Sequence, residues 1–85
     1  MRDDLPLINA LITAFLLLES SGPNEVDPDT AVRGMENMAS SLLTLDQSEQ
    51  VTLRRKLEQI AENEADEAQK NFIRALPDMI GLALP

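Results

Sequence analysis

Apolar residues recur at helical spacing along almost the whole chain, and no alternating run long enough for a strand interrupts them. The strongest run spans residues 5–18 and places most of its apolar side chains on one broad face of a helix. Pro6 fits the first turn and the pair Gly22–Pro23 ends the run, so we expect a helix over about residues 6–21. Two leucines fall outside the main apolar face and need cover of their own, Leu16 and Leu17.

Acidic residues stand at capping positions before the predicted helices. Asp3 or Asp4 precedes the first helix, and Asp27 followed by Pro28 predicts a second helix over about residues 28–45. The methionines on the apolar face of this second helix are expected to fill the core. Two small residues seven positions apart would let another helix approach it closely, Gly34 and Ser41.

A third helix start is marked by Asp46 and Glu49, which are spaced as in a capping box. No glycine or proline follows until Pro77, so we expect one continuous helix over about residues 47–76. A break near Asn63 is the alternative, because the apolar seam thins to alanines there and acidic residues crowd the same stretch. We favour the continuous helix.

These elements predict a single all-α domain over residues 1–85, a small antiparallel bundle of three main helices and a short C-terminal helical segment. The segment covers residues 78–84 and is expected to dock on its own chain; the alternative is a detachable peptide that inserts into a partner. Because the third helix is longer than its partners, it leaves apolar surface that a second subunit would cover. The residues expected to be buried are Phe15, Leu42, Leu57, Ile60 and Phe72.

Histidine, cysteine, tyrosine and tryptophan are all missing from the 85 residues. Nucleophilic catalysis then lacks its usual base, and zinc lacks its thiolate and imidazole ligands. Carboxylates remain, and Glu64 falls on the apolar side of the predicted third helix, where an interface-edge role is favoured over a catalytic one. The acid-rich loop of residues 24–29 lacks the ligand spacing of an EF-hand. We therefore expect no enzyme activity, no cofactor and no bound metal.

The chain carries 15 acidic and 7 basic residues, a formal net charge of -8, which disfavours nucleic acid and anionic membranes as partners. The basic run from Arg54 to Lys56 is expected to face solvent, with Arg54 one helical turn from Glu58. The apolar run of residues 5–18 is too short for a membrane span. Acids beside Arg2 argue against a secretory signal, and the absence of cysteine suits the cytoplasm, where we expect the protein.

A protein is then the expected partner, and we expect a non-catalytic helical interaction or regulatory module that forms a homodimer. The alternative is an acidic inhibitor of the immunity or antitoxin kind, which masks a basic site on another protein through a contiguous acidic patch. A third and weaker hypothesis is a small-molecule pocket among Phe15, Met35 and Met38. The candidate interaction surface comprises Leu16, Leu17, Glu58, Glu62, Asp66 and Glu67.

Overall fold

The computed structural model describes residues 4–85, so the expectations that rest on Arg2 and Asp3 lie outside the described residues. The predicted fold class is confirmed: residues 4–85 form a small all-α bundle without strands. Four helices follow one another along the chain: α1 (Leu5–Ser20), α2 (Pro28–Leu42), α3 (Gln47–Glu62) and α4 (Glu67–Ile80).

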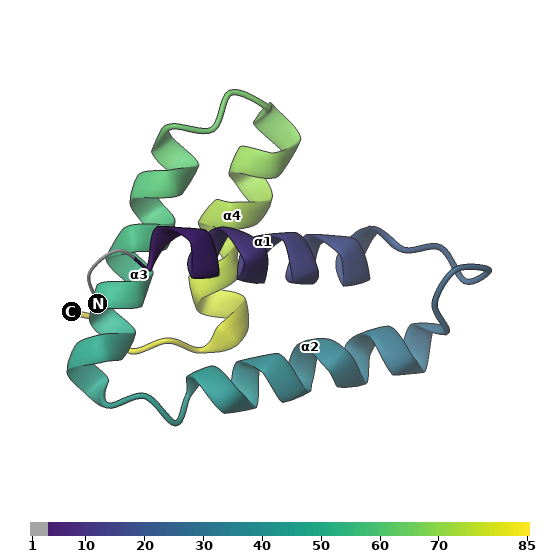
Figure 1. The fold of residues 1–85 in the computed structure, drawn as a ribbon, viewed down its shortest axis with the longest axis horizontal. Helices are drawn as coiled ribbons and strands as arrows, with labels where there is room; N and C mark the ends of the chain where they lie inside the picture. Colours follow the sequence, from purple (N-terminus) through teal and green to yellow (C-terminus); the bar gives the residue numbers. More distant parts are fainter. Residues whose placement is uncertain (1–3) are drawn as a thin grey trace.

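The four helices form two antiparallel hairpins that cross each other (Figure 1). Helices α1 and α2 form one hairpin, α3 and α4 form the other, and α1 passes in front of α3 and α4 in this view. The backbones of α3 and α4 run close together over the most residues, followed by those of α1 and α2. Both hairpins contribute to one core, whose buried residues are Ile8, Ile12, Phe15, Leu53, Leu57, Ala61, Ile73, Leu76, Ile80 and Leu82.

The predicted helix starts are largely confirmed by side-chain caps. Asp27 accepts a hydrogen bond from the Thr30 N–H at 3.2 Å, and Asp46 accepts one from the Glu49 N–H at 2.8 Å. Asp4 precedes α1, but its side chain makes no capping hydrogen bond. The second helix ends earlier than expected, at Leu42, and residues 43–45 form a turn instead.

The expectation of one continuous helix over residues 47–76 is wrong, and the alternative break near Asn63 is correct. The Asn63 amide donates a side-chain hydrogen bond to the Gln59 carbonyl at 3.1 Å and closes α3. Asp66 then accepts a hydrogen bond from the Gln69 N–H at 2.8 Å and starts α4. Folding back lets the buried residues of α3 and α4 pack against each other, which a straight rod of this length would leave uncovered.

The expected separate helical segment over residues 78–84 is also wrong. Helix α4 continues through Pro77 to Ile80, and Gly81 ends it with a positive φ of 89°. Pro77 has no backbone N–H and so removes one hydrogen bond from the helix. The burial of Pro77 and, in the extra turn, of Ile80 offsets this loss. Docking of the C-terminal residues on their own chain is correct, since Leu82 is a buried core residue.

The predicted burial of Phe15 and Leu57 is confirmed, since these side chains are 2% and 0% exposed. The prediction is only partly correct for Leu42, Ile60 and Phe72, which are half-buried and pack against the edge of the core.

Of the two small residues on α2, only Gly34 lies at a close helix contact. A Cβ atom at Gly34 would lie 3.0 Å from Leu18 Cδ1 on α1. Ser41 is exposed, and its hydroxyl donates to the Asn37 carbonyl of its own helix at 3.1 Å. The expectation that Ser41 would let a second helix approach is therefore wrong for residues 4–85.

Candidate interaction surface

Helix α1 is the most apolar helix of the described chain, yet it lies on the outside of the bundle (Figure 1). No charged residue occurs from Leu5 to Leu18, and only Ile8, Ile12 and Phe15 of this helix are buried. The opposite side leaves Leu7 72% and Leu17 62% exposed. Asn9 and Thr13 make part of the exposed side polar, but leucine side chains of a helix normally face a core, so α1 lacks cover at Leu7 and Leu17.

An apolar groove of about 350 Å³ runs beside the first turns of α1. The start of α1, the end of α2 and helix α3 all contribute to it. Asp4 is the only charged residue in its lining. The remaining lining residues are Leu7, Ile8, Leu11, Leu42, Leu45 and Leu53. The groove therefore extends the exposed apolar surface of α1 toward the turn between α2 and α3.

The two leucines singled out by the sequence differ in exposure. Leu17 projects from the outward side of α1 and is exposed, whereas Leu16 is half-buried. The groove residues Leu7, Leu11 and Leu42 were not among the predicted surface residues, because at helical spacing they look the same as core positions.

The four predicted acidic residues lie in the second half of α3 and around the turn into α4, and all four are exposed. Glu58 and Glu62 line one shallow hollow together with Arg74. Asp66 caps α4 through its hydrogen bond to Gln69, and Glu67 begins that helix. The acids therefore share one end of the α3–α4 hairpin, but Arg74 adds a positive charge to the hollow between them.

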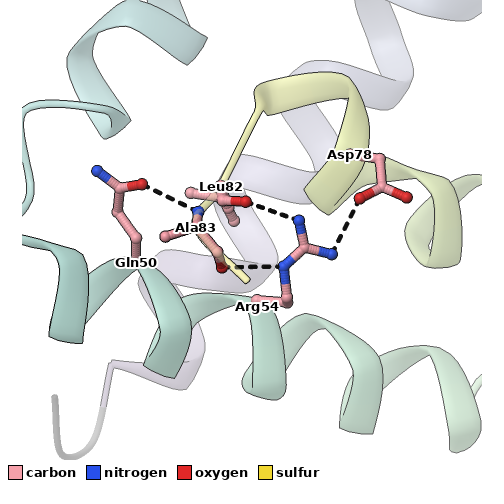
Figure 2. A network of polar contacts seen from close by, with 5 residues as sticks. All are labelled: Gln50, Arg54, Asp78, Leu82 and Ala83. Atoms are coloured by element: carbon pink, nitrogen blue, oxygen red, sulfur yellow. Dashed lines mark hydrogen bonds and ion pairs between the residues drawn. The ribbon is translucent and has the colours of Figure 1, made fainter. Parts of the chain in front are cut away.

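Arg54 contradicts the expectation of a solvent-facing side chain beside Glu58, because it is 7% exposed. Figure 2 shows its guanidinium group enclosed by the C-terminal residues. Nη2 donates to the Leu82 carbonyl at 2.7 Å and Nε donates to the Ala83 carbonyl at 3.1 Å. Nη1 forms an ion pair with Asp78 at 3.0 Å, although the Asp78 side chain is 80% exposed.

Gln50, one turn before Arg54, links the same tail to the turn between α2 and α3. Its Oε1 accepts a hydrogen bond from the Ala83 N–H at 3.0 Å, and its Nε2 donates to the Leu45 carbonyl at 2.9 Å. Figure 2 shows Gln50 and Arg54 on the same side of α3, facing the tail. The tail is thus fixed through backbone groups, which a sequence pattern does not reveal.

Two further predictions concern Glu64 and a pocket among Phe15, Met35 and Met38. Glu64 lies in the turn after α3 and lines a shallow hollow with Lys56, so it is neither buried nor isolated. Phe15 is buried in the core, and Met35 and Met38 pack against that core as filler. Within residues 4–85, no three carboxylates gather closely enough to hold a metal ion. None of the helices in the same residues combines the length and apolar character needed to cross a bilayer.

In comparisons with protein-family models, curated proteins and solved structures, nothing matches this chain.

Proposed function

We propose that this protein is a non-catalytic helical interaction module that forms a homodimer through α1. The observation that carries the proposal is the exposure of the uncharged, apolar outward side of α1. Full burial of one leucine side chain is worth about 1.5 to 3 kcal/mol. Covering Leu7 and Leu17 on both copies therefore supplies a driving force that the isolated chain leaves unused.

The proposal assigns different roles to the two halves of the molecule. The α1 surface joins two copies, while the acidic residues around the α3–α4 turn remain free to meet another protein. A net charge of -8 favours a partner with a basic surface, because the summed field steers such a partner toward the chain. We place this activity in the cytoplasm, a compartment that suits a chain without cysteine.

Molar mass measured by light scattering over a dilution series tests the proposal directly. We expect the mass of a dimer at high concentration and the mass of one chain after dilution. Leu17→Asp should shift the transition to concentrations at least about tenfold higher, because a charge would then be desolvated in the contact. Leu84→Asp is a matched control, since Leu84 is 68% exposed and lies beside Val51 and Arg55 of α3 rather than on α1. One chain at every concentration would refute self-association.

An acidic inhibitor that masks a basic site is the second candidate function. It is supported by the exposure of Glu58, Glu62, Asp66 and Glu67 at one end of the α3–α4 hairpin. It is weakened by Arg74, which shares the hollow with Glu58 and Glu62. A double charge reversal, Glu58→Lys with Glu62→Lys, would abolish binding to a basic target enzyme and restore its activity, while Leu17→Asp would leave the inhibition intact. The opposite pattern would exclude the inhibitor function.

A further inference from the structure

We infer that the second copy docks on α1 in antiparallel orientation, with the two-fold axis passing beside residue 12. The inference rests on the proposed homodimer and specifies which residues meet. Its starting point is the exposed stripe of α1, defined as Leu7, Ala10, Ala14 and Leu17. These four residues are spaced by three, four and three positions, so they share one side of a helix.

The burial pattern places this stripe on the uncovered side of α1. Leu7, Ala10 and Leu17 are exposed and Ala14 is half-buried, whereas the buried Ile8, Ile12 and Phe15 occupy the other side of the wheel. In Figure 1, α1 lies in front of the α3–α4 hairpin, and no other helix lies in front of α1. The exposure of Leu7, Ala10 and Leu17 shows that this side of α1 is not covered by another helix of residues 4–85.

The stripe is complementary to the same stripe of a second copy when the two α1 helices are antiparallel. In that orientation Leu7 lies opposite Leu17 of the second copy, and Ala10 lies opposite Ala14 of the second copy. Both pairs are centred on residue 12, as a two-fold contact requires, because each contact must occur twice. The large residues meet at the two ends of the stripe, and the alanines in its centre allow the helix axes to approach to about 8 Å.

Charge also favours a second copy over a basic partner at this stripe. The chain carries a net charge of -8, but residues 5–18 contain no charged side chain. Glu19 lies on the opposite side of the helical wheel, and Asp4 lines the groove next to Leu7, at one end of the stripe. A basic partner would therefore find no carboxylate to pair with along the stripe between Leu7 and Leu17. Two copies, by contrast, bring together only uncharged surface.

Single cysteine variants test the register, since the chain has no cysteine of its own. Ala10→Cys and Ala14→Cys are purified separately, mixed under reducing conditions and then oxidised. We expect the mixed disulfide to exceed either self-linked product by roughly tenfold, because only the mixed pair brings two Cα atoms within about 7 Å. Two copies of Ala10→Cys would have their sulfur-bearing residues offset by about 6 Å along the axis, at 1.5 Å per residue. Ser40→Cys, exposed on α2, is the control for random collisions.

The outcomes separate this inference from the proposed homodimer. Preferential self-linking of Ala10→Cys would indicate parallel helices and would overturn the inference. A dimer in light scattering whose α1 cysteines link no faster than Ser40→Cys would also overturn it, and would leave the homodimer standing on another surface. One chain at all concentrations would refute both. Circular dichroism and light scattering of each reduced variant must match the parent, so that a loss of linking is not a loss of folding.

Discussion

Arg54 lies on α3 between Leu53 and Leu57, two of the most deeply buried residues of the core. A guanidinium group at such a position is unstable unless hydrogen bonds replace its hydration. The carbonyls of Leu82 and Ala83 and the carboxylate of Asp78 supply those bonds. No buried side-chain polar atom within residues 4–85 lacks a hydrogen-bond partner. One arginine thus holds the last residues of the chain against the bundle.

Replacing Arg54 with methionine should lower the free energy of unfolding by about 2 to 4 kcal/mol, because charged hydrogen bonds contribute about 1.5 to 3 kcal/mol each. Arg54→Lys should restore only part of the loss, since an ammonium group cannot bond two carbonyls and a carboxylate with the same fork. Urea denaturation followed by circular dichroism measures the change. The control is Arg55→Met at the exposed neighbouring position, with an expected change within about 0.5 kcal/mol. Equal midpoints for the two variants would contradict the assigned role of Arg54.

Leu57 has no exposed surface and lies at the centre of the core. Leu57→Asp should abolish the cooperative thermal transition, because a charge without a partner would be placed among apolar side chains. Leu57→Ala should cost about 2 to 5 kcal/mol, a large share of the stability of a small domain. Leu17→Asp makes the same chemical change at an exposed position and should keep its helical signal at 222 nm. A cooperative melt for Leu57→Asp at the parental temperature would place the core elsewhere.

At the level of the helices, an aspartate precedes each of the four helix starts of residues 4–85, and three of the four make a side-chain capping bond. Asp46 and Asp66 each accept a hydrogen bond of 2.8 Å from a backbone N–H three residues later, whereas Asp4 makes none. Asp46→Ala and Asp66→Ala should therefore each cost about 1 kcal/mol. Asp4→Ala should cost clearly less, and chemical denaturation of the three variants under identical conditions gives the comparison. Equal losses in all three would show that the aspartates act by charge near the helix ends.

These caps also explain how far the sequence predicts the helices. Local signals located the starts of α2 and α3 correctly, because a cap is formed by residues three positions apart. The pair Asp66 and Gln69 carries the same signal for α4, but the expectation of one continuous helix rested on the lack of glycine and proline and did not use this pair. The helix end predicted before Pro77 is wrong, because α4 continues through Pro77 to Ile80. Pro77 is buried in the core, and such a tertiary contact has no signal in the local sequence.

The sequence predicted that the candidate interaction surface includes exposed apolar residues of the first helix, but it did not predict where the groove lies. The leucine-rich first helix indicated surplus apolar surface, and α1 does leave Leu17 exposed. The groove depends on how the end of α2 and helix α3 meet α1, and the hydrogen bonds of Arg54 to the tail join residues 28 and 29 positions apart. Neither arrangement has a local signature, because the groove forms only where the two hairpins meet and the Arg54 bonds form only when α4 folds back along α3.

At the scale of the whole molecule, the crossing of two short hairpins leaves one helix exposed. The radius of gyration is 12.9 Å, slightly above the value of about 12 Å expected for a compact domain of this length. Four helices of 14 to 16 residues give α1 neighbours on its inner side only. The most apolar helix therefore remains at the surface, where a second copy would complete the bundle.

The salt dependence of dimerisation follows from combining this apolar contact with the charge of the chain. Each protomer carries a formal charge of -8, so two protomers repel each other over the whole molecule even though the α1 stripe itself is uncharged. The screening length falls from about 30 Å at 0.01 M salt to about 8 Å at 0.15 M, which removes most of that repulsion and leaves the apolar contact intact. The dissociation constant of the dimer, measured by sedimentation equilibrium, should therefore fall by roughly fivefold or more between these two salt concentrations. A dissociation constant that rises with salt would mean that ion pairs hold the copies together, and the α1 stripe contains no group that forms them.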